Sequence, residues 1–182
     1  MALIVETGSV VAGADSYVDL TYATTYHSTR GNTAWGSAAA PAQETCLRLA
    51  AQYLDAKYLA RWKGTKISAL QARQWPRWGV YLDNSRDFSS ETYDVGIQHG
   101  MLPSNAIPDQ VKQAQCELAI RALSGPLAPD LARGGMIQSK QIAGVLSTTY
   151  APGAPPGMVY QFVTMLLAEL LNPTNQLSIV RG

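Results

Sequence analysis

Helical periodicity, interrupted at fixed points by proline and glycine, is the feature that most restricts how this chain can fold. After Pro41, apolar and aromatic residues recur at steps of four, three and four: Leu47, Ala51, Leu54 and Tyr58. This spacing puts them on one face of an amphipathic helix. We expect that helix to begin at Pro41 and to end near Trp62.

Three further segments contain residues that typically begin or end a helix. Ser16-x-x-Asp19 is similar to a capping box and predicts a helix that ends at Gly31. Pro108 suits the first position of another helix, which Gly125-Pro126 terminates. A last helix, apolar over most of its length, is expected from about Met158 to Leu171, before Asn172-Pro173.

Between these helices the pattern changes twice. Residues 63–107 are broken up by glycine and proline, with a short helix conceivable from Ile67 to Gln74. So long an irregular stretch is uncommon in a compact chain and is usually functional. Met136 to Tyr150 forms two runs around Ala143-Gly144, rich in residues that favour strands, which predicts a β-hairpin.

The predicted fold class is therefore mainly α: a small bundle of about four helices with a β-hairpin, a long central loop and extended termini. A chain of 182 residues is enough for one domain with a real core. We divide that single domain as follows: N-terminal arm 1–14, helical core 15–133 with loop 63–107, β-hairpin 134–151, C-terminal helix 156–172 and tail 173–182.

Composition indicates contact with partners rather than a strong affinity for nucleic acid. Charged residues make up 15% of the chain, against about 25% in typical soluble domains. Some of this weakly charged surface is therefore expected to be buried against other chains. With 14 basic and 13 acidic residues the net charge is +1, so no global attraction to DNA is expected.

Cellular context follows from the cysteines and the apolar runs. Cys46 and Cys116 are the only cysteines, and their helical surroundings favour buried free thiols in a reducing cytoplasm. The N-terminus has no signal-peptide pattern, and the longest apolar run is too short for a membrane span. We expect a protein made in the cytoplasm, without a membrane partner.

No catalytic, metal or cofactor site is expected. His27 and His99 are the only histidines, and neither has a ligand partner at a metal-binding spacing. The chain has no nucleophile elbow, Walker motif or dinucleotide-binding glycine motif. The sequence therefore predicts a protein that is not an enzyme.

One basic and aromatic cluster does point to a ligand. No acidic residue lies between Asp55 and Asp83, and three of the four tryptophans fall in this interval. The candidate nucleic-acid contacts in this cluster are Lys63, Lys66, Arg73, Trp75 and Arg77. They could bind single strands by ion pairing and stacking, anchor the loop to the helices, or line a DNA channel.

Several segments follow one another in an order that is informative as a set: Ala14 to Tyr17, Arg30-Gly31-Asn32 with Trp35, Ala50 to Asp55, Trp62 to Lys66, Trp75-Pro76-Arg77, Ile107 to Ala114 and Ile137 to Tyr150. Together they resemble the head-to-tail adaptors, or connectors, of tailed phages. Proteins similar to these are often labelled putative DnaT-like single-stranded-DNA-binding protein. The resemblance covers nearly the whole chain, although residues 81–101 look like an insertion.

The adaptor resemblance implies a structural role in the virion neck, between capsid and tail. It implies a cyclic homo-oligomer, a dodecamer, that docks under the portal protein, receives a stopper or tail protein and lets genomic double-stranded DNA pass. Portal or inter-subunit contacts would then come from Ile137, Ile142, Val145, Leu146, Tyr150, Gln176, Leu177, Ile179, Val180 and Arg181. The alternative is a DnaT-like accessory protein of replication that binds single-stranded DNA.

Overall fold

The fold is mainly helical, as the sequence predicts. A computed structural model describes residues 2–82, 100–129, 139–142, 146–149 and 158–173. Within these ranges the elements, in chain order, are α1 (Leu20–Ser28), α2 (Thr33–Ser37), α3 (Ala40–Lys57), β1 (Thr65–Lys66), β2 (Arg77–Trp78), α4 (Asp109–Ala122), β3 (Ser139–Ile142), β4 (Leu146–Thr149), α5 (Gln161–Leu166) and the 3₁₀ helix η1 (Ala168–Leu170).

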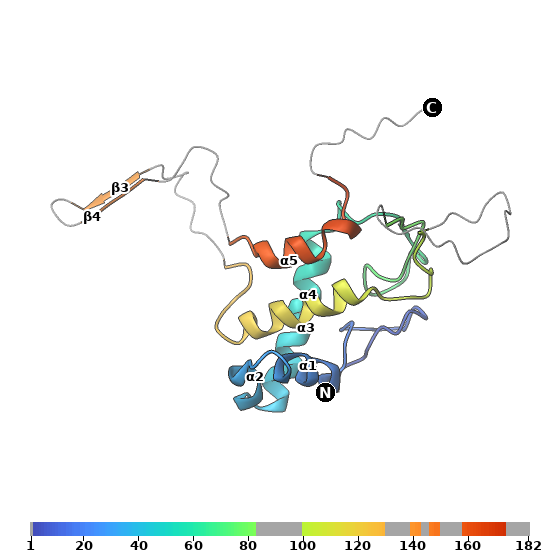
Figure 1. The fold of residues 1–182 in the computed structure, drawn as a ribbon, viewed down its shortest axis with the longest axis horizontal. Coiled ribbons are helices and arrows are strands. Elements are labelled where there is room, and N and C mark those ends of the chain that lie inside the picture. The colour runs from blue at the N-terminus through green and yellow to red at the C-terminus, as the bar shows by residue number, and fades with distance from the viewer. Residues whose placement is uncertain (1, 83–99, 130–138, 143–145, 150–157, 174–182) are drawn as a thin grey trace, which may run out of the picture.

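The core lies where α3 and α4 pack together. Leu47 and Leu54 of α3 and Val111 and Leu118 of α4 are completely buried. Both pairs lie seven residues apart, which is the spacing of one apolar helix face. In Figure 1, α1 and α2 lie near one end of α3, and α5 lies near the other end. Helices α1 and α5 therefore both pack against the central pair of helices.

The predicted start of the first helix needs correction. The first helix begins at Leu20, after Asp19, whose carboxylate accepts a hydrogen bond from the Tyr22 amide at 2.6 Å. Ser16 does not cap it, because the Ser16 hydroxyl bonds inside the core to the Val18 carbonyl. Gly31 does adopt the left-handed conformation, at φ 68°. A short helix, α2, follows it and was not predicted.

The other helices are shorter than their apolar patterns suggested. The helix after Pro41 ends at Lys57 rather than near Trp62, and Pro108 is the cap before α4 rather than its first residue. The predicted C-terminal helix divides into α5 and η1. Helix ends are the least certain part of a pattern-based prediction, since apolar spacing continues into turns that also pack on the core.

The predicted N-terminal arm is not free. The Glu6 side chain is buried, and its carboxylate accepts hydrogen bonds from the amides of Gly8, Val10 and Val11 at 2.9 to 3.1 Å. Val5 also pairs in parallel with Ser16. The arm therefore folds around the Glu6 carboxylate and packs against the helices. The apolar, glycine-containing sequence of the arm did not predict this structure.

The described part of the central loop is ordered around a small ribbon. β1 and β2 pair antiparallel, with Thr65 opposite Trp78 and Lys66 opposite Arg77. The short helix considered from Ile67 to Gln74 does not form. Instead, the side-chain amide of Gln71 in this segment donates hydrogen bonds to the carbonyls of Arg73 and Pro76. Most of the 81–101 segment lies outside the described residues.

The predicted β-hairpin is confirmed as an antiparallel pair. The register runs from Ser139 opposite Thr149 to Ile142 opposite Leu146. β3 and β4 form a two-stranded sheet of their own. A two-stranded hairpin is only marginally stable by itself in water. Among the described residues, no helix is long and apolar enough to span a bilayer.

Candidate nucleic-acid interface

Trp75 occupies the core rather than the surface. Its side chain is 0% exposed. Its ring meets Trp62 edge to face, with centroids 5.7 Å apart, and Trp62 meets Tyr58, the residue after α3, at 5.8 Å. Edge-to-face packing of this kind stabilises an interior. A base cannot stack on Trp75 while the fold is intact.

Arg77 is also turned inward, with 7% of its surface exposed. Its guanidinium donates to the carbonyl oxygens of Lys63 at 2.8 Å, Gly64 at 2.6 Å and Gln74 at 3.2 Å. Burial lowers the pKa of Arg77 from its ordinary value. The side chain therefore ties β2 to the segment before β1 and is not directed at a ligand.

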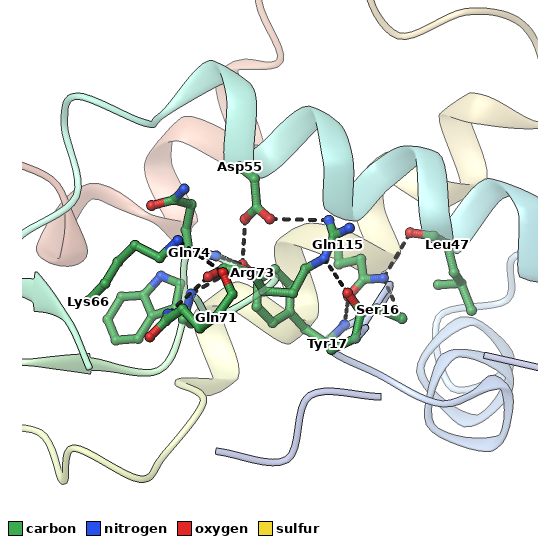
Figure 2. A network of polar contacts seen from close by, with 11 residues as sticks. Ser16, Tyr17, Leu47, Asp55, Lys66, Gln71, Arg73, Gln74 and Gln115 are labelled. Carbon is green, nitrogen blue, oxygen red and sulfur yellow. Dashed lines mark hydrogen bonds and ion pairs between the residues drawn. The ribbon is translucent and has the colours of Figure 1, made fainter. Parts of the chain in front are cut away.

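Arg73 belongs to a polar network under the same loop (Figure 2). Its guanidinium lies 3.1 Å from the Asp55 carboxylate and also donates to the Ala14 carbonyl at 2.9 Å. The Tyr17 hydroxyl donates to the other oxygen of Asp55 and accepts from the amides of Gln74 and Trp75. The network thus joins the N-terminal segment, α3 and the loop.

Burial is the main cause of the shifted pKa values of Asp55 and Tyr17 in this network. Loss of solvent raises the pKa of Asp55, although the Tyr17 hydrogen bond and the Arg73 charge oppose that rise. The pKa of Tyr17 is raised, first by burial and then by the adjacent Asp55 carboxylate. Such shifts are found at functional sites and in structural networks alike. Here the polar groups bond to one another, which fits a structural role.

Gln115 extends the polar contacts to α4 (Figure 2). Its side chain is fully buried and accepts from the Tyr17 amide at 2.9 Å. Its amide group donates to the Ser16 hydroxyl at 2.7 Å and to the Leu47 carbonyl at 2.9 Å. One side chain of α4 therefore fixes both the N-terminal segment and α3.

The two lysines of the predicted cluster are half-buried at the ribbon. The ammonium of Lys66 donates to the Gln71 carbonyl at 3.1 Å, and that of Lys63 to the Tyr81 carbonyl at 3.3 Å. Beside them, Trp78 is 58% exposed. The sequence places Trp78 in the basic and aromatic cluster but not among the candidate contacts. Side chains alternate along a strand, so Trp78 faces outward beside the inward-facing Arg77.

His27 is a core residue. It is completely buried, its Nδ1 lies 3.0 Å from the Asn32 amide nitrogen, and its ring packs on Trp35 at 4.6 Å. Burial lowers its pKa. Cys46 and Cys116 are buried free thiols, as predicted. In the part of the chain that the structure describes, no three potential ligand side chains gather as a metal site would require.

Most of the predicted portal or inter-subunit contacts lie outside the described residues. Ile142, the last residue of β3, lies opposite Leu146, the first residue of β4. The remaining eight, which fall in ranges not described, are Ile137, Val145, Tyr150, Gln176, Leu177, Ile179, Val180 and Arg181.

A family comparison covers the whole chain. A family model described as Putative DnaT-like ssDNA binding protein matches residues 1–182. No curated protein and no solved structure matches the chain significantly.

Proposed function

The chain belongs to the family of putative DnaT-like ssDNA binding proteins, and we propose that it works by binding other protein subunits, as a head-to-tail adaptor of a tailed phage. In this role, a ring of copies, with twelve as the expected number, docks under the portal and extends the DNA channel. The ring then receives a stopper or tail protein at the virion neck.

One observation carries this proposal: the basic and aromatic cluster, the strongest nucleic-acid signal of the sequence, is engaged within its own chain. Trp75 and Arg77 are buried, and Arg73 is paired with Asp55. A protein that binds DNA tightly gains most of its affinity from cations that reach phosphates. Three of the five candidate contacts, Arg73, Trp75 and Arg77, hold the loop on the helices instead.

The chain has surfaces suited to protein contacts. A self-paired hairpin is stabilised when it packs on another element or chain. Several large apolar side chains are exposed on α5 and around the β1–β2 ribbon. A net charge of +1 also suits a ring through which DNA must pass without being held.

Reconstitution with the portal protein from the same genome tests the proposal. We expect the full-length chain to co-sediment with assembled portal in a fixed ratio and to add a ring of density beneath it in electron micrographs. A chain that stays in the supernatant with assembled portal, at low and at moderate salt, would contradict an adaptor role.

The second candidate is single-stranded-DNA binding in replication, which the description of the matched family favours. The exposed Trp78, with Lys63 and Lys66 nearby, is the surface to which we would assign it. Stacking of one base on an aromatic side chain contributes about 1–3 kcal/mol. Under this alternative, Trp78→Ala weakens binding about tenfold or more, and affinity falls steeply with salt.

Fluorescence titration with a labelled oligonucleotide separates the two candidates. We expect weak binding that Trp78→Ala leaves unchanged, with the exposed Leu49→Ala on α3 as the matched control. Tight, salt-sensitive binding that Trp78→Ala abolishes and Leu49→Ala preserves would favour the replication role over the adaptor.

A further inference from the structure

Helix α5 presents large apolar side chains to solvent. Phe162 and Met165 lie three residues apart and so share one helix face. Met158 and Val159 lie just before the helix. The exposed fractions are 61% for Met158, 54% for Val159, 48% for Phe162 and 66% for Met165. We call these four residues the α5 patch.

The opposite side of α5 is firmly seated. Val163 and Leu167 are completely buried. The Thr164 hydroxyl lies 2.9 Å from the Tyr58 hydroxyl. The helix cannot rotate to bury its outer face without losing these contacts. The α5 patch is therefore a fixed feature of the surface.

Charge does not select what covers the α5 patch. No charged residue occurs from Met158 to Ala168. The guanidinium of Arg121 lies 6.0 Å from the ring centroid of Tyr160, but it is paired with Glu117 at 2.7 Å. An uncharged apolar patch is an interaction site for other apolar side chains. Apolar character and proximity therefore decide between the possible occupants.

The chain turns back along α5 as soon as that helix has ended. The Leu170 carbonyl accepts a hydrogen bond from the Lys63 amide at 3.0 Å, and the Asn172 amide donates one to the Arg61 carbonyl at 2.7 Å. The last described residues therefore run from the level of Lys63 toward that of Tyr58, which lies beside the middle of α5. This direction leads back toward the start of the helix.

Residues 174–182 continue from this point, and we call them the tail. They lie outside the described residues. The tail contains Leu177, Ile179 and Val180 and no acidic residue. Its nine residues can span about 30 Å when extended, whereas the six residues of α5 rise by only about 9 Å. The apolar residues of the tail can therefore reach the whole α5 patch.

We propose that the tail binds the α5 patch of its own chain, with Leu177, Ile179 and Val180 against Phe162 and Met165. Only residues 174–176 separate Leu177 from the last described residue, Pro173. So short a tether gives the tail a local concentration in the millimolar range. A second copy at micromolar concentration does not match this advantage.

The segment on the other side of the α5 patch is a poorer occupant. Residues 150–157 directly precede Met158, but they include three prolines and only one large apolar side chain, that of Tyr150. The tail supplies three apolar side chains within four residues. Composition therefore favours the tail among the two segments that adjoin the patch.

This inference goes beyond the proposed function, because it concerns the free chain before it meets any partner. Under the adaptor function, the tail residues are also expected to contact the portal. The tail would then leave α5 on docking and uncover an apolar surface for another subunit. Binding of the tail within the free chain does not require that step.

A cysteine pair tests the contact in the full-length chain. Gln161→Cys on α5 and Ser178→Cys in the tail retain every apolar residue of both surfaces. Gln161 lies four residues before Met165 and so on the same side of the helix. The native Cys46 and Cys116 are buried. Under mild oxidation we expect a disulfide within one chain, formed at a rate that does not depend on protein concentration.

The matched control adds Leu177→Ser and Ile179→Ser to the same cysteine pair. The tether is unchanged, so any difference comes from the two apolar side chains. The disulfide should form about tenfold more slowly, because these side chains no longer gain free energy from burial. Equal rates would overturn the proposal. Disulfides that form only between chains, faster at higher concentration, would place the tail on a second copy and would also overturn it.

Oxidation of methionine by hydrogen peroxide gives a second readout, without added cysteines. In full-length Leu177→Ser/Ile179→Ser, Met158 and Met165 should be oxidised faster than in the wild type, as peptide mass spectrometry measures. Met101, which is 37% exposed at the base of the ribbon, is the reference within the same molecule and should react at an unchanged rate. Unchanged rates at Met158 and Met165 would contradict coverage by the tail.

Neither experiment contains portal, so the inference and the proposed function can fail separately. If the tail binds α5 but the chain does not co-sediment with portal, only the adaptor function fails. If the chain co-sediments with portal but the serine substitutions change neither readout, only the tail contact fails.

Discussion

Arg73 and Asp55 form an ion pair that little solvent reaches. Their side chains are 17% and 14% exposed, and they lie between the N-terminal segment and α3. A buried pair is weak evidence of net stabilisation, but removing one partner leaves an uncompensated charge in the interior. The role of Arg73 as a structural cation can therefore be measured directly.

Arg73→Met should lower the free energy of unfolding by about 3 kcal/mol, because Asp55 is left with the Tyr17 hydroxyl as its remaining side-chain donor. Urea denaturation measures the loss. Arg48→Met is the control, since Arg48 pairs with Asp15 in a more exposed position and should cost less than about 1 kcal/mol. Equal losses in the two variants would show that Arg73 is not a structural cation.

His27 should make stability depend on pH. Burial lowers its pKa in the folded state, so the unfolded chain binds a proton more readily. Its contribution is complete above the unfolded pKa of about 6.5 and is lost as the pH falls from that value toward the lower folded pKa. Glu117 and Arg30 act on the same ring with opposite signs, raising and lowering its pKa respectively.

We expect the wild-type free energy of unfolding to fall between pH 6.5 and 5.5, with a slope of at most about 1.4 kcal/mol per pH unit from this one group. His27→Gln should flatten that slope, as measured by urea titrations at each pH. His99→Gln should leave it unchanged. An identical slope in the wild type and His27→Gln would rule out His27 as its source.

At the scale of elements, the β1–β2 ribbon depends on a close backbone approach at Gly64. Its φ is 69°, and a Cβ atom there would lie 2.3 Å from the Trp78 carbonyl oxygen and 2.8 Å from a Val80 methyl carbon. Gly79 has a similar φ of 72°, but a Cβ there would meet nothing within 4 Å. Substitutions at the two glycines therefore separate the free-energy cost of the steric clash at Gly64 from the cost of a positive φ, which both positions share.

Gly79→Ala should cost about 1 kcal/mol, the penalty of a left-handed residue with a side chain. Gly64→Ala should cost roughly 3 kcal/mol, because the backbone of β2 must also move. Thermal unfolding of both variants gives the difference. If the two variants melt together, the ribbon does not need the close approach.

The elements also show what the sequence could and could not predict. The α3 and α4 helices, and the register-forming runs of the hairpin, were predictable because each follows a repeating local pattern. The folded N-terminal arm was not, because it depends on Glu6 accepting amides from its own loop. The start of α1 after Asp19 and the end of α3 at Lys57 depend on single caps and turns, which the apolar repeat does not specify.

The candidate site was harder to predict than the fold. The lysines, arginines and tryptophans between Asp55 and Asp83 were visible as a cluster. The direction in which these side chains point was not visible, because it depends on partners distant in the sequence. These partners are Asp55 for Arg73, Trp62 for Trp75, and the carbonyls of Lys63 and Gly64 for Arg77. The alternative in which this cluster anchors the loop matches that geometry.

At the scale of the whole molecule, the described chain buries Trp62, Trp75 and Arg77, pairs Arg73 with Asp55, and exposes apolar side chains, Trp78 among them, on α5 and the ribbon. A single-strand binder turns its stacking and phosphate-binding side chains outward, whereas most of this cluster faces inward. It supports the proposed role in protein assembly, whereas the description of the matched family names single-stranded-DNA binding.

The most direct test of the proposed adaptor role is quantitative mass spectrometry of virions purified from cultures of the cells that carry the gene for this chain. The adaptor account predicts that the chain is present in a fixed ratio of about one copy per portal subunit, as docked rings of matching symmetry require. Its absence from virions, together with abundance in infected cells, would contradict the account and favour single-stranded-DNA binding.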